Sequence, residues 1–315
     1  MRHLHLVAPD PAAIVRAVGP LPEGVAIVPL SDKAALAGVA AEVEALVCFP
    51  HMLDQALVDA MPRLGWLQTL TAGVDPLIGL DLGGVTVTSM SGVQAPQMSE
   101  HAFFLLLALA RDIRGTLAAQ DEKRWAPAPP RLLAGSHLVI VGVGRIAGEL
   151  AIRAQAFGMR VTGISAAPRD LPGFDAVRPR EELADAAAEA DQIVVLSPDT
   201  PANRGLVSRA VLARLRPHAI LVSMGRGTVV DEAALAELLA QGRIAGAGLD
   251  VFAVEPLPAD SPLWHEPRAI LTPHVGGRSP AFVDQVAPVI AENARHWFAE
   301  PPLPLRNCIE SNALR

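Results

Sequence analysis

Four residues in the last third of the chain have side chains suited to binding an anion and moving a proton: Arg226, Asp250, Glu255 and His274. The arginine stands between two glycines, and its planar, permanently charged fork matches a carboxylate. A histidine exchanges a proton near neutral pH, and a neighbouring carboxylate favours its protonated form and orients the ring. This set predicts a site that holds a carboxylate and transfers a proton.

Each of these residues lies at or just after the end of an apolar, β-favouring run. Parallel strands joined by crossover helices are predicted, because such runs alternate with helical patterns along the chain. Ligands of open parallel sheets bind at the carboxyl ends of the strands, where side chains from several strands meet. The predicted strands of this second series are 137–142, 160–165, 192–197, 219–224, 246–251 and 269–275.

The segment VIVGVGRIAGELA (139–151) has the pattern G-x-G-x-x-A at Gly142, Gly144 and Ala147. It follows a strand pattern and opens a helical one, which is the context that a dinucleotide-binding turn requires. Gly142 permits the tight turn and Gly144 lets the backbone approach a pyrophosphate, which the N–H groups and dipole of the new helix stabilise. An ordinary glycine-rich turn is the alternative interpretation.

Hydride exchange between a nicotinamide and a 2-oxo or 2-hydroxy acid uses all of these parts. Arg226 would hold the substrate carboxylate, His274 would protonate the carbonyl oxygen, and Glu255 would favour the imidazolium. Taken singly, each has a plain structural interpretation: a solvated turn arginine, loop polarity and a buried histidine. Their joint order after a dinucleotide turn favours the chemical interpretation.

The segments VGVGRIAGELA, LSPDTPANRGLV, GRGTVVDEAALAELLAQGRIAGAGLDVFAVEPLP, SPLW and LTPHVGG resemble the D-isomer-specific 2-hydroxyacid dehydrogenases, and within them the glyoxylate/hydroxypyruvate reductase branch. The resemblance is dense over residues 90–285 and looser over 1–90. It implies an α/β fold in which a Rossmann-type doubly wound parallel sheet is inserted into a smaller flavodoxin-like α/β domain. The substrate domain would comprise 1–95 plus 286–315, and the dinucleotide-binding domain 96–285.

The resemblance also implies the site residues. Arg226 would bind carboxylate, His274 would act as acid/base with Glu255 as its partner, and Asp250 would lie near the nicotinamide amide. The expected substrate-binding residues are Ala72, Gly73 and Val74 through their backbone N–H groups, together with Arg226 and His274. The expected cofactor-binding residues are Gly142, Gly144, Arg145, Ile146, Ser165, Arg169, Pro198, Met224, Gly225, Arg226, Asp250, His274 and Gly276. Family members are usually homodimers, with the helix near 100–115 at the interface.

The second strand of the dinucleotide-binding series lacks the acidic residue that accepts hydrogen bonds from the ribose of NAD. The segment VTGIS ends in Ser165, and Arg169 follows. A serine hydroxyl and an arginine suit a 2′-phosphate, so NADP is expected as the preferred cofactor over NAD. Two alternatives stay open: Asp170 folds back to replace the missing acid, or Ser165 and Arg169 are merely exposed.

The composition narrows the class of protein. The chain has 315 residues and a net charge of -7 without a Lys/Arg run, which argues against nucleic-acid binding. The apolar stretch 101–110 is shorter than the ~20 residues of a membrane span, so a cytoplasmic protein without membrane association is expected. Two distant cysteines fit a reducing compartment. No metal is expected, because there is no HExxH or equivalent cluster.

Rival functions remain. A nicotinamide-sensing, corepressor-like binding protein without significant turnover would use the same scaffold, but the basic or disordered extension that such a protein needs is not expected here. Phosphoglycerate or formate are rival substrates within the enzyme class. The loop CFPHML (48–53) is expected to border the substrate, where Phe49 or Met52 would set pocket size, or else to pack in the core.

Overall fold

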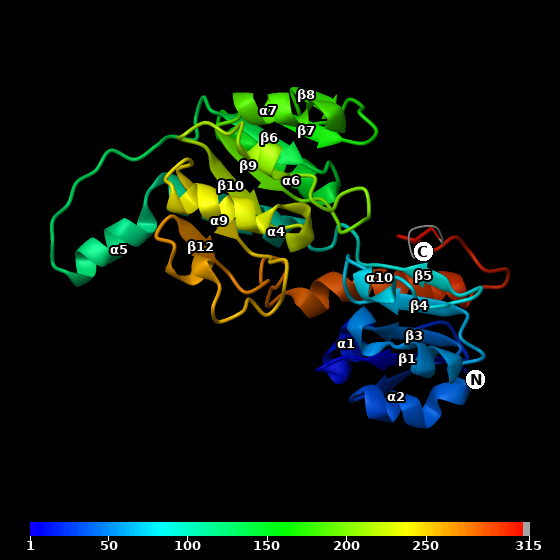
Figure 1. Cartoon of the computed structure of the whole chain (residues 1–315). Helices are drawn as coiled ribbons and strands as arrows, with labels where there is room; N and C mark the ends of the chain where they lie inside the picture. Colours follow the sequence, from blue (N-terminus) through cyan, green and yellow to red (C-terminus); the bar gives the residue numbers. More distant parts are fainter. Residues whose placement is uncertain (311–315) are drawn as a thin grey trace. The chain divides into compact units, whose positions relative to one another are not determined.

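A computed structural model describes residues 1–310 and divides the chain into two compact units (Figure 1). Unit 1 combines the chain up to Gln94 with the residues from Ser279 onward, and unit 2 is Ala95–Arg278. The boundaries expected from sequence lay after residues 95 and 285. Residues 279–285 therefore belong with unit 1, whose last helix they begin.

Unit 1 is a five-stranded parallel sheet in the order β2-β1-β3-β4-β5. This is the flavodoxin-like strand order. Its strands are β1 (Arg2–Val7), β2 (Val25–Leu30), β3 (Ala45–Cys48), β4 (Trp66–Thr69) and β5 (Thr86–Thr88). Its helices are α1 (Pro11–Val18), α2 (Lys33–Val39), α3 (Gln55–Asp59) and α10 (Phe282–Trp297).

Both faces of the unit 1 sheet are covered by helices. Buried side chains of α1 and α10 pack on one face, and those of α2 and α3 pack on the other. Aspartates start the first three helices: the carboxylates of Asp10, Asp32 and Asp54 each accept a hydrogen bond from a backbone N–H of the first turn. Local capping and apolar periodicity therefore agree with the tertiary fold.

Unit 2 is a seven-stranded parallel sheet in the order β12-β11-β10-β9-β6-β7-β8. Its first six strands in chain order give the doubly wound Rossmann arrangement, with a seventh added at one edge. The strands are β6 (His137–Val141), β7 (Arg160–Ser165), β8 (Ala176–Pro179), β9 (Gln192–Val195), β10 (Ile220–Ser223), β11 (Gly246–Leu249) and β12 (Ala269–Leu271). The predicted fold class is confirmed, and β8 is the one strand of this sheet that the sequence did not suggest.

Helices cover both faces of this sheet as well. Helices α4 (Ala95–Ala110) and α6 (Arg145–Ala156) pack over β6, β7 and β10. Helices α7 (Leu183–Glu189), α8 (Arg209–Leu212) and α9 (Glu232–Ala240) pack on the opposite face.

The apolar stretch 101–110 lies in α4, which approaches β11 so closely that a Cβ on Gly248 would meet Leu105 Cβ at 2.9 Å. Among the described residues, no helix has the length and apolar character to cross a membrane.

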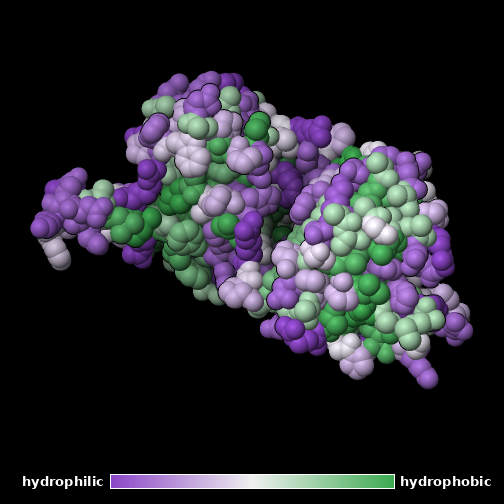
Figure 2. Space-filling model, turned by 90° about the horizontal axis from the view of Figure 1, so that it is seen from below, coloured by the Kyte–Doolittle hydropathy of each residue, from purple (hydrophilic) through white to green (hydrophobic). Residues whose placement is uncertain are grey.

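One segment of unit 2 departs from this layered arrangement. Helix α5 (Ile113–Asp121) and the loop after it stand apart from the sheet and its covering helices (Figure 1). Figure 2 shows this arm as mainly hydrophilic, with hydrophobic surface where it joins the rest of the unit. This loop carries Trp125, whose side chain is 95% exposed.

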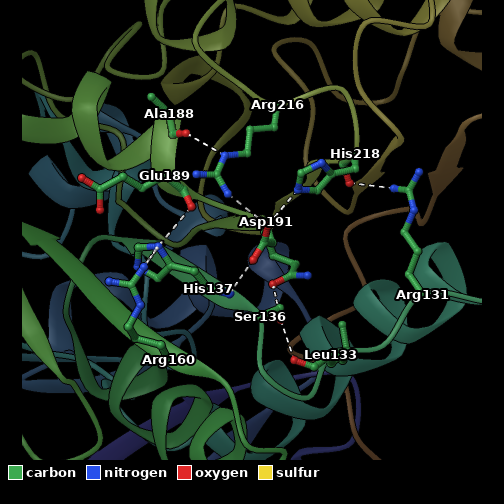
Figure 3. A network of polar contacts seen from close by, with 11 residues as sticks. Arg131, Leu133, Ser136, His137, Arg160, Ala188, Glu189, Asp191, Arg216 and His218 are labelled. Carbon is green, nitrogen blue, oxygen red and sulfur yellow. Dashed lines mark hydrogen bonds and ion pairs between the residues drawn. The ribbon is translucent and has the colours of Figure 1, made fainter.

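A polar network closes the amino ends of the central strands of unit 2 (Figure 3). His137, at the start of β6, is buried, with Nε2 2.9 Å from Thr162 Oγ1 and Nδ1 2.9 Å from Arg160 Nη2. Asp191, just before β9, accepts hydrogen bonds from the His137 backbone N–H and from His218 Nε2, both at 2.8 Å. This network ties together four neighbouring strands at the edge opposite the predicted site.

Candidate active site

The glycine-rich turn between β6 and α6 has the geometry that a dinucleotide phosphate needs. Gly142 has φ +97°, and a Cβ there would meet Ser197 Oγ at 2.7 Å, so only glycine fits. Gly144 is the N-cap of the 12-residue helix α6, without a side-chain cap, and nothing lies within 4 Å of a Cβ built on it. This open, uncapped helix start, where Arg145 and Ile146 follow, fits an anion held by backbone N–H groups.

The carboxyl end of β7 carries no acidic side chain. The strand ends at Ser165, whose Oγ accepts from the Ala167 backbone N–H at 3.2 Å. Arg169 and Asp170 follow on an exposed loop, and Arg169 Nη1 donates to Ala167 O at 3.4 Å. A hydroxyl and a guanidinium therefore lie within the same turn, where an NAD site would present a carboxylate.

The two glycines around Arg226 are required by neighbouring backbone. A Cβ on Gly225 would collide with the backbone at Ser197, and a Cβ on Gly227 would collide with the backbone at Phe252. Arg226 itself is half-buried just beyond β10, and its Nη1 donates to Gly225 O at 2.8 Å. The arginine is thus fixed between two close chain segments and is not a freely solvated turn residue.

Glu255 and His274 form a direct pair. His274 Nδ1 lies 2.8 Å from Glu255 Oε2, while Glu255 Oε1 accepts from the Phe252 backbone N–H at 3.0 Å. The carboxylate is anchored by its own loop and so can fix the orientation of the imidazole. Because Nδ1 is engaged and the His274 side chain is 48% exposed, Nε2 is the nitrogen positioned to exchange a proton with a bound molecule.

Asp250 supports the loop that carries this histidine. Its side chain is 1% exposed, and its carboxylate accepts from Thr272 Oγ1 at 2.5 Å and from the backbone N–H groups of Val275 and Gly276 at 3.0 and 2.9 Å. Burial alone would raise the pKa of Asp250, but these hydrogen bonds and one from His101 outweigh it and lower that pKa. The carboxylate stays ionised and holds the loop.

The candidate residues of unit 2 meet at the carboxyl edge of its sheet. A Cβ on Gly276 would lie 2.8 Å from Met224 Cε and 2.9 Å from Asp250 Oδ2, so the segment before Arg226 and the loop of His274 are in contact. Pro198 lies in the loop that follows β9, and its carbonyl accepts from Asn203 Nδ2 at 2.9 Å. Met224, Asp250 and Gly276, three of the predicted cofactor-binding residues, therefore lie side by side at this edge.

The predicted substrate-binding residues Ala72, Gly73 and Val74 lie in unit 1, in the loop after β4. Thr71 Oγ1 donates to Gly73 O at 2.6 Å and shapes this loop. In the same unit Phe49 stacks on Phe282, with ring centroids 6.1 Å apart.

Two contacts around the histidine loop were not predicted. His101 Nε2 lies 3.0 Å from Thr272 Oγ1, and Gln97 Nε2 donates to Gly277 O at 3.3 Å. Gln97 and His101 are four residues apart on α4, a spacing that puts both on one helix face. That spacing is visible in the sequence, but the partner loop is not. Within residues 1–310 no group of three His, Cys, Asp or Glu is placed to hold a metal ion.

Known proteins with similar sequences and structures share this architecture. Residues 103–276 match the model of the D-isomer specific 2-hydroxyacid dehydrogenase, NAD binding domain. A glyoxylate reductase of Korarchaeum cryptofilum is 34% identical over 253 residues, which are 76% of this chain and 75% of the relative. The chain spans about half the length of the D-3-phosphoglycerate dehydrogenases that it also matches, such as that of Mycobacterium tuberculosis, at 33% identity over 84% of this chain and 51% of the relative.

Solved structures of similar proteins also match this chain. A D-isomer specific 2-hydroxyacid dehydrogenase family protein from Aeromonas salmonicida superposes with a TM-score of 0.89 at 33% identity, covering 98% of this chain and 99% of that one. A D-isomer specific 2-hydroxyacid dehydrogenase from Xanthobacter autotrophicus Py2, in complex with NADPH and MES, gives 0.85 at 30% identity over 100% of both chains. The chain belongs to the D-isomer-specific 2-hydroxyacid dehydrogenase family, with an NAD(P)-binding Rossmann domain.

Proposed function

We propose that this protein is a reductase that uses NAD(P)H to convert a small 2-oxo acid of the glyoxylate or hydroxypyruvate type into the D-2-hydroxy acid. The observation that carries the proposal is the His274–Glu255 pair, 2.8 Å apart, at the strand edge that also holds Arg226 and the open turn at Gly144. The nicotinamide cofactor supplies the hydride when bound. The protein's side chains then have to bind the substrate and supply a proton.

Each side chain has a role that its contacts permit. Arg226, held between close backbone segments, pairs with the substrate carboxylate through two parallel hydrogen bonds. His274 gives a proton from Nε2 to the carbonyl oxygen as negative charge develops there, while Glu255 holds Nδ1.

The cofactor would be held by the residues of unit 2 that the sequence indicated. Gly142, Gly144, Arg145 and Ile146 suit the pyrophosphate, because the start of α6 is uncapped and open. The nicotinamide end would be held by Pro198, Met224, Gly225, Asp250 and Gly276.

We propose NADPH as the preferred cofactor. Ser165 ends β7 in place of an acid, and the exposed Arg169 follows in the same loop. One charge-assisted contact to the 2′-phosphate, of roughly 1.5–3 kcal/mol, corresponds to about a 10- to 100-fold preference. The relative from Xanthobacter autotrophicus Py2 was solved with NADPH.

A substrate panel tests the activity. Glyoxylate, hydroxypyruvate, pyruvate, longer 2-oxo acids and 3-phosphohydroxypyruvate are compared by kcat/KM with NADPH. The highest value is expected for glyoxylate or hydroxypyruvate, since the glyoxylate reductase relative aligns over most of its own length. A higher value with 3-phosphohydroxypyruvate would favour the phosphoglycerate class, and nucleotide binding without turnover of any acid would favour a sensor.

We also propose that the protein acts as a homodimer through the arm of unit 2. The arm exposes apolar side chains, with Trp125 95%, Leu132 67% and Leu117 50% exposed. Where it joins the body, Ile113 and Ile270 line a cavity of about 360 Å³, whose lining also includes Arg111, Asp112, Arg114, Arg131 and Arg268. A second copy would cover the exposed apolar side chains of the arm.

Light scattering tests the dimer. The unmodified protein should have twice the mass of the chain, and Trp125→Ala combined with Leu117→Ser should shift it toward the monomer. A monomer at micromolar concentration in the unmodified protein would contradict the proposal.

A further inference from the structure

We propose that His101 is a positioning residue for this site. From α4 it holds Thr272 and Asp250 in place, so that the loop 273–277 presents His274 in one orientation. The inference rests on the proposed 2-oxo acid reduction and assigns to α4 a part in the site beyond packing.

The contacts form a chain from the helix to the buried carboxylate. His101 Nε2 lies 3.0 Å from Thr272 Oγ1 and 3.4 Å from Asp250 Oδ1. Thr272 Oγ1 donates its hydrogen to Asp250 Oδ1 at 2.5 Å, so it can accept one from His101 Nε2. Nε2 of His101 therefore carries the proton in this arrangement. The His101 side chain is 16% exposed, which limits competition from water for this contact.

The loop that Asp250 holds needs support. His274 has φ +52°, a left-handed conformation that side-chain-bearing residues adopt uncommonly. Such a conformation persists where surrounding contacts determine it. Here the His274 N–H donates to Asp250 O at 2.9 Å, and the N–H groups of Val275 and Gly276 donate to the Asp250 carboxylate. Any shift of Asp250 is thus passed directly to the backbone of His274.

Helix α4 holds the loop at both ends. His101 contacts Thr272 before the histidine, and Gln97, one turn earlier, donates to Gly277 O at 3.3 Å after it. The ring of His101 also packs closely against the loop, because a Cβ on Gly276 would meet its Cδ2 at 3.3 Å. The two side chains together form a clamp from one helix face.

Three substitutions at position 101 separate a hydrogen-bonding role from simple packing. His101→Gln keeps an N–H donor near the place of Nε2, His101→Asn keeps the amide but falls short of Thr272, and His101→Leu removes the donor. Glu100→Gln, on the exposed side of the same helix, is the matched control. The readouts are kcat and KM for the 2-oxo acid, NADPH affinity by fluorescence titration, and Tm.

We expect His101→Leu and His101→Asn to lower kcat about tenfold or more, because a small misplacement of a reacting group is costly. KM for the 2-oxo acid should change much less, since Arg226 is not part of the clamp. NADPH should bind several-fold more weakly, because Asp250 and Gly276 adjoin the nucleotide site. His101→Gln should recover most of both losses, and Glu100→Gln should match the unmodified protein.

Three results would overturn the inference. These are a His101→Asn variant with kcat within twofold of the unmodified protein, equal losses in His101→Gln and His101→Asn, or a loss of Tm that alone accounts for the lower activity. If the unmodified protein reduces none of the 2-oxo acids, the proposed function fails, but the NADPH affinities of the Gln and Asn variants still decide whether the clamp exists. If His101→Leu does not fold, the comparison of His101→Gln with His101→Asn still tests the inference.

Discussion

The two edges of the unit 2 sheet use the same residue types in opposite ways. At the amino edge His137 is 3% exposed and both ring nitrogens have protein partners: Nε2 pairs with Thr162, and Nδ1 with Arg160, which Figure 3 draws. At the carboxyl edge the His274 side chain is 48% exposed and, among residues 1–310, only its Nδ1 has a protein partner, Glu255. In the sequence both are histidines beside an apolar run. The difference in hydrogen-bond saturation separates a structural histidine from one that can act on a bound molecule.

Two aspartates also differ between the amino and carboxyl edges of this sheet. At the amino edge Asp191 accepts hydrogen bonds from the His137 N–H and from His218 and forms an ion pair with Arg216, so its charge is balanced by protein groups. At the carboxyl edge Asp250 is equally engaged, but with the backbone of the loop that carries His274. A saturated polar group thus stabilises the fold at one edge and orients a reactive group at the other.

The largest expected effect is at His274. His274→Asn should lower kcat by about 10²- to 10⁴-fold, the usual contribution of a positioned acid/base group. Asparagine keeps a donor toward Glu255, so Tm should change little. His137→Leu should instead keep kcat/KM, measured per folded molecule, close to normal. A His274→Asn variant that retains more than about a tenth of kcat would remove the distinction between the two histidines.

A smaller loss is expected at Arg226. Arg226→Ala should lower kcat/KM by about 10²-fold, corresponding to on the order of 3 kcal/mol for a charge-assisted contact whose partner is left unpaired. Arg226→Lys should recover little, because a point charge lacks the fork. The control is Arg131→Ala at the amino edge, where the guanidinium bonds only the His218 carbonyl in this network and kcat/KM should hold. Near-normal kinetics of Arg226→Lys would mean that Arg226 is a turn residue and does not bind the substrate carboxylate through its fork.

The two ends of strand β7 give the third test. It begins at Arg160 in the amino-edge network and ends at Ser165. Ser165→Asp and Arg169→Ala should each reduce the expected 10- to about 100-fold preference for NADPH over NADH, because a carboxylate repels the 2′-phosphate and loss of the guanidinium removes its partner. Arg160→Ala should leave the preference unchanged. The measurement is kcat/KM for both nucleotides, and preference for NADH in the unmodified protein would refute the assignment.

The sequence predicted local features well and long-range contacts poorly. Short patterns of glycine and apolar residues predict the turn at Gly142 and the strands that end near Arg226 and His274. The structure contains this turn and these strands. Strand β8 was missed, because it is four residues long, has no buried residue and ends in proline. His101 was missed because its partner Thr272 is 171 residues away, a pairing that only the tertiary fold creates.

The smallest expected effect concerns stability at the amino edge. Burial, and then the nearby charge of Arg160, lower the pKa of His137 in the folded protein. In the unfolded chain the pKa of a histidine is about 6.5, so just below that pH the unfolded state binds more protons than the folded state. The free energy of unfolding therefore falls as the pH decreases through about 6.5 toward the lower pKa of folded His137. His137→Leu should cost about 1–3 kcal/mol at about pH 7.5, because the buried Thr162 hydroxyl loses its partner.

The same substitution should flatten the acid dependence of stability. His137→Leu removes one group that gains a proton on unfolding, so the slope of unfolding free energy between about pH 6.5 and about pH 5 should fall, by at most about 1.4 kcal/mol per pH unit. Urea unfolding across that range measures the slope. His265→Gln, an exposed histidine of the same unit, should leave it unchanged. His5, in unit 1, also has a pKa lowered by burial, so part of the acid sensitivity should remain in the variant. An unchanged slope in His137→Leu would mean that the amino-edge histidine is not held neutral, and that saturation of its nitrogens is no guide to its charge.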